Sequence, residues 1–231
     1  MIYDQLTHDI AREFALFSMA VDGLYMTLRA PGATITPHAV NEFQRRAHRA
    51  AGILLSNTLG VLSTYESSLT SELSERPNVH EPLVNAAQTL DGYVRQIIDQ
   101  RIKQLRGNGQ MDASALLLHD AHGAVGKLLQ HKLEQPKSTL KDTAGRTWAA
   151  DKLVRTDLRH ALYQAYLRAQ VVTIAKTTDL AKLVYPDPEH TYHGTVLSIS
   201  GQPGWPALDR NWNTVFHHHS RATLEPYVYA E

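Results

Sequence analysis

Residues 142–166 read DTAGRTWAADKLVRTDLRHALYQAY, and the pattern of the chain changes at this stretch. Before it, apolar residues recur every three or four positions, which is typical of helices. After it come YPDPEHTYHGTVLSISG at 185–201 and FHHHSRATLEPYVYA at 216–230, where turn residues bracket short strands and a group of histidines. We therefore expect any functional site to lie in this last third of the chain.

The first 136 residues carry four apolar stripes with helical spacing. The stripes cover residues 6–28, 40–69, 83–105 and 116–129. Thr36 provides a hydroxyl N-cap for the second helix, with Pro37 at its first position. Stop signals follow the first three stripes, and a capping residue precedes the fourth: Pro31-Gly32, Pro77, Gly107-Asn108-Gly109 and Asp112. We expect Gln135-Pro136 to end the fourth helix.

The last third predicts one more helix and several short strands. The helix runs from Trp148 to about Lys176, after a polar boundary at 137–146 with Gly145 as a turn residue. Strands are expected at 180–185, 195–200 and 222–229, with loops at 185–193 and 202–213. Because Pro226 interrupts the last strand, we expect it to be an edge strand or to end there. The expected fold is therefore mainly α: a long-helix body at 1–136 and a small α+β module with short strands at 137–231.

Composition excludes several classes of protein. Lys+Arg and Asp+Glu are equal at 23 each, so no charge surplus drives nucleic-acid binding, and the 43% hydrophobic content supports a packed core. There is no cysteine, hence no disulfide and no thiolate metal site. No apolar run approaches the roughly 18 residues that span a bilayer, and no signal peptide is evident at the N-terminus. We expect a protein without a membrane partner that works, or is assembled, in the cytoplasm.

Histidines of the last third are candidate metal ligands. His190 and His193 form one pair, and His217 lies further along in the His217–His219 triplet. Neutral imidazoles are common metal ligands, and ligand pairs from separate segments build small zinc sites. The spacing allows His190, His193 and His217 to hold zinc or another divalent ion, with Asp187, His219 or water as the fourth ligand. The alternative is that these histidines are ordinary structural or surface residues.

Arginines of the fifth helix form a second candidate group. Arg155 and Arg159 are four residues apart and share a helix face, with Thr156 and Asp157 between them. Two guanidinium groups there can clamp a carboxylate, a phosphate or a loop that folds back. The alternative is a solvated face. No nucleophile elbow, phosphate-binding loop or dinucleotide fingerprint is present, so we do not expect an enzyme.

Three pieces of the last third resemble the minor capsid, or minor head, proteins of tailed phages, the family typified by the F protein of phage Mu. Each piece is similar to one segment of the family: an opening Gly-Arg-x-Trp with an Arg-Thr-x-x-Arg helix, an acidic-His-Gly-strand segment, and a closing His-Pro-Asn-Cys-Arg segment with Leu-x-Pro-Tyr. The matching positions are Gly145, Arg146, Trp148, Arg155, Thr156 and Arg159, then Asp187, His190 and Gly194, and finally His217, Arg221, Leu224, Pro226 and Tyr227. The family's cysteine is Ser220 here, and His218-His219 replace its Pro-Asn.

The resemblance covers roughly residues 142–229 and implies a structural virion protein present in a few copies. It would lie inside the phage head near the portal, after assembly in the host cytoplasm, and act in head assembly, DNA packaging or DNA delivery. The implied partners are the portal protein, the major capsid protein and the packaged DNA. We expect Arg155 and Arg159 to brace the loops that carry His190 and His217. Two alternatives stay open: a metal-dependent hydrolase or nuclease that uses the histidines, and a helical scaffold or adaptor.

Overall fold

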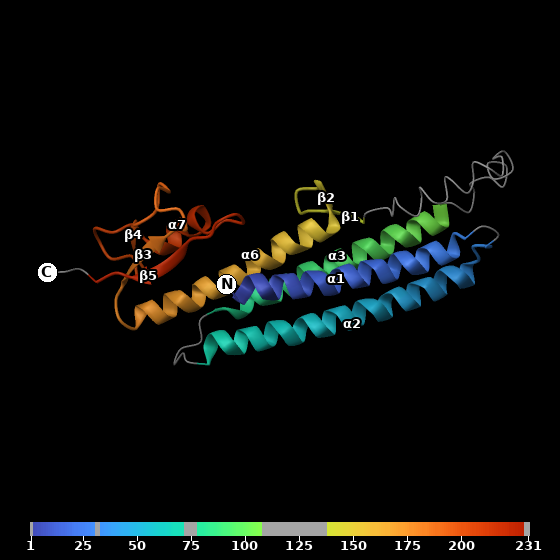
Figure 1. Ribbon diagram of the computed structural model, residues 1–231, viewed down its shortest axis with the longest axis horizontal. Coiled ribbons are helices and arrows are strands. Elements are labelled where there is room, and N and C mark those ends of the chain that lie inside the picture. The colour runs from blue at the N-terminus through green and yellow to red at the C-terminus, as the bar shows by residue number, and fades with distance from the viewer. Residues whose placement is uncertain (1, 31–32, 72–77, 108–137, 229–231) are drawn as a thin grey trace. The chain divides into compact units, whose positions relative to one another are not determined.

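The computed structural model describes residues 2–30, 33–71, 78–107 and 138–228, and it confirms a mainly α fold with short antiparallel strands towards the C-terminus (Figure 1). The helices are α1 (Ile2–Leu28), α2 (Pro37–Thr70), α3 (His80–Gly107), α6 (Ala150–Ala175) and α7 (Leu208–Val215). The strands are β1 (Thr139–Lys141), β2 (Thr147–Ala149), β3 (Leu180–Val184), β4 (Val196–Ser198) and β5 (Thr223–Pro226). The stop signals at Pro31-Gly32 and Pro77, and the expected helix from Asp112 to Gln135, lie outside the described residues.

The chain forms two compact units, and each unit draws segments from both sides of residue 136. One unit comprises Ile10–Asn57 and Thr89–Val154, and we call it the hairpin unit because it contains the paired strands β1 and β2. The other, which we call the C-terminal unit, comprises Met1–Asp9, Thr58–Gln88 and Arg155–Glu231. Long helices contribute segments to both units, because their apolar stripes continue over many turns. That residues 1–136 and 137–231 form two separate domains stays a prediction.

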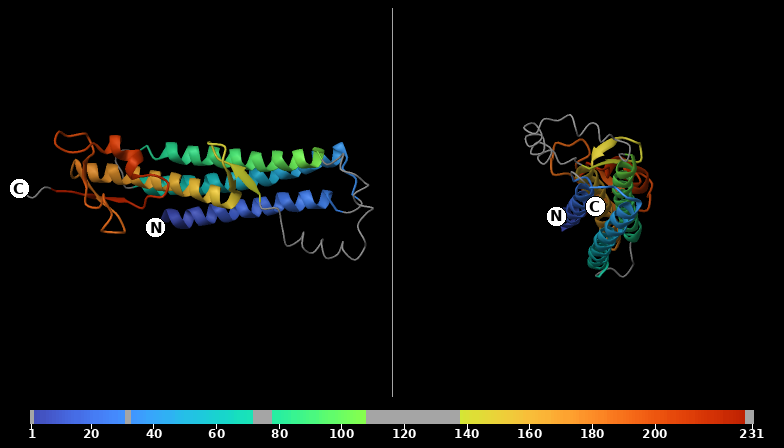
Figure 2. Two further views of the ribbon diagram at one scale, coloured as in Figure 1. Left: turned by 90° about the horizontal axis from the view of Figure 1, so that it is seen from above. Right: turned by 90° about the vertical axis from the view of Figure 1, so that its right-hand side faces the viewer.

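In the hairpin unit, segments of α1, α2 and α3 run alongside one another (Figure 2). The apolar positions of the α1 stripe are buried as the periodicity predicts, with Phe14, Phe17 and Val21 at most 4% exposed. A buried Arg101 adds a polar contact, since its guanidinium pairs with the Asp22 carboxylate at 2.8 Å and its side chain is 3% exposed. Such a pair contributes mainly to the specificity of packing, because desolvation offsets much of its attraction.

The cap of α2 forms as the sequence predicts. The amide of Ala39 donates to Thr36 Oγ1 at 3.1 Å, and the amide of Val40 donates to the Thr36 carbonyl at 3.1 Å. The bond to Thr36 Oγ1 satisfies an amide that the first turn of a helix leaves without a helical partner, and the bond to the Thr36 carbonyl is the first main-chain bond of the helix. Pro37 is the first helical residue, where its missing amide proton has no cost.

A β-hairpin replaces the expected helix start at Trp148. Strands β1 and β2 are antiparallel, with Leu140 opposite Trp148, and α6 begins only at Ala150. The reason is local: Asp142 Oδ1 accepts from the amides of Ala144 (2.9 Å) and Arg146 (2.8 Å). Gly145 completes the turn with φ of 76°, a conformation that glycine adopts without strain. The turn keeps residues 147–149 extended, so the helix prediction for Trp148 was wrong.

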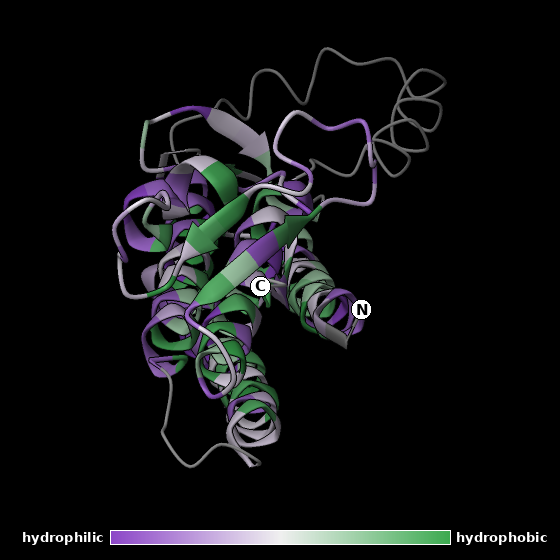
Figure 3. Cartoon of the chain, turned by 90° about the vertical axis from the view of Figure 1, so that its left-hand side faces the viewer, coloured by the Kyte–Doolittle hydropathy of each residue, from purple (hydrophilic) through white to green (hydrophobic). Residues whose placement is uncertain are grey.

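The C-terminal unit contains a three-stranded antiparallel sheet of order β4-β3-β5. The central strand β3 is largely hydrophobic in Figure 3, and its residues Ala181 and Leu183 are fully buried. The predicted strands are confirmed, including the edge position of β5, which ends at Pro226. Helix α7 corrects the loop expected at 202–213. Pro203, Gly204 and Pro206 lie just before this helix and are typical of loops, which led to the loop prediction. The buried residues of the helix are Leu208 and Val215.

Candidate functional site on helix α6 and the C-terminal segment

Most residues that resemble the minor head proteins lie in the C-terminal unit: on helix α6, in the loop between β3 and β4, and in residues 216–228, which we call the C-terminal segment. Gly145, Arg146 and Trp148 belong to the hairpin unit. Polar side chains of α6 hold the main chain of the C-terminal segment. Tyr163 donates its hydroxyl proton to the Ala222 carbonyl at 2.7 Å, and Gln164 Nε2 donates to the Phe216 carbonyl at 2.7 Å. The C-terminal segment is therefore fixed by hydrogen bonds from a helix as well as by the sheet.

Gln170 acts on strand β5 in the same way. Its Nε2 donates to the Leu224 carbonyl at 3.3 Å, and its Oε1 accepts from the Leu224 amide at 3.4 Å. A side-chain amide thus pairs with both main-chain groups of one residue, as a neighbouring strand would. This contact covers part of the edge that β5 would otherwise leave open.

Tyr163 and Gln164 are buried, so the loss of either contact would leave a polar group without water. Gln164 uses both ends of its amide, because its Oε1 also accepts from Trp212 Nε1 at 2.5 Å. Burial raises the pKa of the Tyr163 phenol, which therefore remains a proton donor at any physiological pH. The two residues connect α6 to α7 and to the C-terminal segment.

Ser220 stands where the resembling family has a cysteine, and here it is 3% exposed. Its Oγ lies 3.3 Å from the Tyr163 hydroxyl and accepts from the Ala222 amide at 3.2 Å. The Ser220 amide donates to the His217 carbonyl at 2.9 Å, which closes a turn. Ser220 therefore shapes the turn at the start of the C-terminal segment and connects it to α6.

The two arginines of the Arg-Thr-x-x-Arg pattern have different surroundings. Arg159 Nε lies 3.2 Å from Asp4 Oδ1, and its guanidinium lies over the rings of Tyr3 at 5.7 Å and Tyr163 at 5.9 Å. Arg155 is exposed and makes no hydrogen bond or ion pair with another described residue. Arg159 thus connects α6 to the start of α1, and neither arginine is seen to brace the loops of His190 and His217. Thr156 is half-buried, and Arg221 is exposed.

His190 and His193 belong to a tight loop between β3 and β4. The His190 ring stacks on Tyr185 with centroids 3.7 Å apart, and His193 Nδ1 accepts from the Tyr185 amide at 3.1 Å. Asp187 Oδ1 accepts from the Glu189 amide at 3.0 Å. Gly194 has φ of 80° and donates its amide to the Leu183 carbonyl at 2.8 Å. These matched residues shape the loop, and glycine is needed where φ is positive.

The described residues contain no group of three or more His, Asp or Glu side chains placed to hold a metal ion. The structure therefore does not gather His190, His193 and His217 around one ion. His217 Nδ1 instead accepts from the His219 amide at 3.2 Å, and the two rings are 6.4 Å apart.

At the other end of the C-terminal segment, Tyr227 donates its amide to the Leu180 carbonyl at 2.9 Å. This bond lies next to the strand pair of Pro226 and Ala181.

A stacked pair of histidines is the contact that the sequence pattern did not indicate. The rings of His160 on α6 and His218 in the C-terminal segment are 3.9 Å apart and inclined by only 14°. His218 Nε2 lies 3.8 Å from Asp157 Oδ1. Burial, followed by the charges of His218, His217 and Arg159, lowers the pKa of His160 to about 4. His160 lies one helical turn from Tyr163 and Gln164, and this shared face is the sequence signal that could have indicated it.

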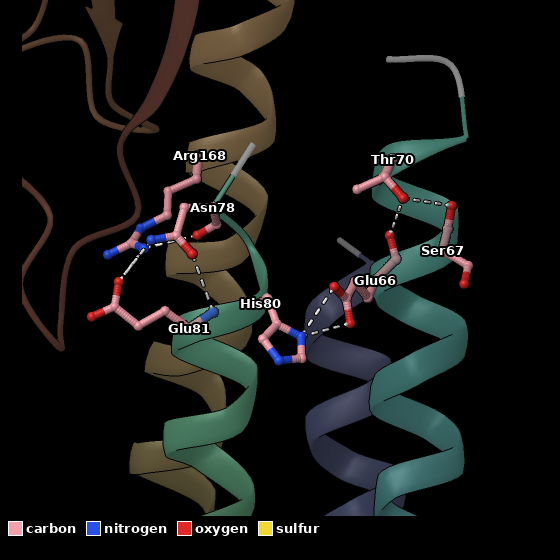
Figure 4. A network of polar contacts seen from close by, with 7 residues as sticks. All are labelled: Glu66, Ser67, Thr70, Asn78, His80, Glu81 and Arg168. Atoms are coloured by element: carbon pink, nitrogen blue, oxygen red, sulfur yellow. Dashed lines mark hydrogen bonds and ion pairs between the residues drawn. The ribbon is translucent and has the colours of Figure 1, made fainter. Parts of the chain in front are cut away.

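A network of polar contacts joins the end of α2 and the start of α3 to α6 within the same unit (Figure 4). Arg168 Nη1 on α6 donates to the Asn78 carbonyl at 2.8 Å and to Glu81 Oε2 at 2.9 Å. Asn78 Oδ1 accepts from the Glu81 amide at 3.4 Å at the start of α3. His80 Nδ1 lies 3.2 Å from Glu66 Oε1 on α2. The hydrogen bond from Arg168 lowers the pKa of Glu81, so this carboxylate stays charged and keeps the contact.

Comparisons with protein-family models, curated proteins and solved structures found no match for this chain. Among the described helices, none combines the length and the apolar composition that crossing a membrane requires. The site itself consists of hydrogen bonds, ring stacks and ion pairs that fix the main chain.

Proposed function

We propose that this chain is a structural minor head protein of a tailed bacteriophage, which lies inside the head near the portal and acts in head assembly, DNA packaging or DNA delivery. One observation carries the proposal: most matched residues of the last third have structural contacts within a single unit. Arg159 pairs with Asp4, His190 stacks on Tyr185, and Gly194 occupies a positive-φ turn. A protein whose signature residues fix its own fold suits an assembly role.

The hairpin unit offers a surface suited to protein partners. Leu16, Met19 and Met26 on α1 are 51%, 62% and 45% exposed, and their spacing places them along one face of the helix. Exposed apolar side chains that gather on one face are characteristic of protein contacts. The partners that we propose are the portal protein, the major capsid protein and the packaged DNA.

Mass spectrometry of gradient-purified virions tests the proposal. We expect the chain in intact virions and in tail-free heads, at a few copies relative to the major capsid protein, and not in isolated tails. Its absence from virions that contain the portal protein would contradict the proposal. Metal analysis of the purified chain, with a plasmid-cleavage assay in added divalent ions, separates it from the hydrolase alternative.

A further inference from the structure

The stack of His160 on His218 is a contact between a helix and the C-terminal segment that depends on uncharged rings. Two imidazoles lie face to face at 3.9 Å, which suits neutral aromatic rings and disfavours two like charges at that separation. Protonation of both rings would place two like charges at this separation.

The surroundings of His160 leave a second proton without an acceptor. Its Nδ1 is completely buried and has no hydrogen-bond partner among the described residues. An imidazolium donates from both ring nitrogens, so a charged His160 would bury an unpaired donor. His218 differs, because the Asp157 carboxylate lies 3.8 Å from its Nε2 and half of its side chain is exposed. Protonation of His160 at its buried Nδ1 is therefore unfavourable.

The charged groups around His160 act in the same direction. The C-terminal segment contributes His218 and His217, and α6 contributes Arg159, each of which opposes a positive charge on His160. The Asp157 carboxylate faces His218. The effects of these three groups add to that of burial, so the folded unit stabilises the neutral form of His160.

We propose that the His160–His218 stack is an acid-sensitive contact, and that a proton on His160 releases residues 217–221 from α6 while the helix remains folded. The linkage has a definite sign: a histidine with a folded pKa lowered to about 4 stabilises the docked segment above the ordinary histidine value of about 6.5. This stabilisation is lost as pH falls from about 6.5 towards about 4. The inference does not depend on the proposed role in the phage head.

Hydrogen exchange of the full chain at pH 7.5 and pH 5.0 tests the inference, with rates corrected for the intrinsic effect of pH. In the unaltered chain we expect protection of amides in 216–224 to fall roughly tenfold at pH 5.0, less than the full pKa difference implies because the ring is partly exposed. The hairpin at 139–149 is the internal reference and should not change. Equal protection of 216–224 at the two pH values would overturn the proposal.

Variants separate this contact from a general response to acid. In His160→Phe the ring still stacks but takes no proton, so the loss of protection at pH 5.0 should disappear. The matched control is His48→Phe, since His48 is an exposed histidine on α2 and its variant should respond as the unaltered chain does. If circular dichroism shows that His160→Phe is not folded at pH 7.5, His160→Gln replaces it. Retention of the full acid response in the folded variant would refute the role of His160.

Discussion

The β1–β2 hairpin and the C-terminal segment are both short stretches outside the long helices, yet they are fixed in opposite ways. The hairpin is organised by the carboxylate of Asp142, which accepts from the Trp148 indole only six residues away. The C-terminal segment is held from α6, as in the bond from Tyr163 to Ala222 over 59 residues. The hairpin is mostly exposed, whereas Ser220, Ala222 and Leu224 are buried.

This difference indicates where each region is vulnerable. Water can replace a partner that is lost at the exposed hairpin, so the net cost of losing one hydrogen bond there is small. In the buried C-terminal segment, a polar group that loses its partner cannot bond to water instead. The loss in the free energy of unfolding therefore includes the desolvation of that group. Substitutions in the two regions should therefore rank by burial and not by the number of hydrogen bonds removed.

The largest effect is expected from Gln164→Leu. The substitution leaves the Phe216 carbonyl and the Trp212 indole without their partners, at a cost of roughly 3 kcal/mol in the free energy of unfolding. The shift of the urea midpoint measures it. Gln5→Leu, at an exposed position of α1, is the control and should change stability by less than about 0.5 kcal/mol. Equal effects of the two variants would contradict the ranking.

Tyr163→Phe removes one hydroxyl and keeps the ring. It deprives the Ala222 carbonyl of its donor and should destabilise by about 1–2 kcal/mol. Tyr192→Phe, which removes a hydroxyl from a side chain that is 43% exposed, should be nearly neutral. Thermal unfolding of both variants provides the comparison. A neutral Tyr163→Phe would show that the hydroxyl does not stabilise the segment.

Acid should loosen the hairpin through Asp142. Desolvation has the largest single effect and raises the pKa of this carboxyl, but hydrogen bonds from the Arg146 amide, the Trp148 indole and the Arg146 guanidinium, with the charge of Arg146, lower it to about 2. Because the folded pKa is lowered, the contribution of Asp142 is present above the ordinary value of about 3.8 and is lost as pH falls through about 2. Fluorescence of the three tryptophans, compared with that of Asp142→Asn, follows the change. A response unaltered by Asp142→Asn would assign the acid effect to another group.

The smallest effect is expected at Gly145. An alanine Cβ meets no atom within 4 Å there, so only the φ of 76° opposes the substitution, at a cost of about 1 kcal/mol or less. Gly92→Ala on α3 also meets open space and should stabilise by about 0.5–1 kcal/mol, because alanine favours helix. Opposite signs in urea unfolding are the expected result. The same sign for both would show that φ does not decide the outcome.

The sequence predicts those parts of the fold that depend on local pattern. Apolar spacing predicts the long helices, Thr36 predicts the cap of α2, and Pro226 predicts the edge strand. The hairpin was missed because strands of three residues carry too little alternation to detect. Helix α7 was missed because prolines and glycines precede it and because its packing partners lie on α6.

The candidate site was predicted in part. The sequence singled out His190, His217 and Arg159, yet it assigned them to a metal site or to a brace between loops. Their partners Tyr185, His219 and Asp4 became evident only in the structure. The contacts of Tyr163, Gln164 and His160 with the C-terminal segment lie far apart in sequence, and no periodicity encodes such pairs. Position on a helix face predicts burial but does not identify the partner.

Side chains of α6 hold the C-terminal segment, which carries the last part of the minor-head resemblance. Hydrogen exchange of Gln164→Leu at pH 7.5, with each peptide compared to the unaltered chain, is the decisive test. We predict loss of protection in residues 216–227 and no change in the hairpin at 139–149. Unchanged protection of residues 216–227, or equal loss in both regions, would contradict the claim.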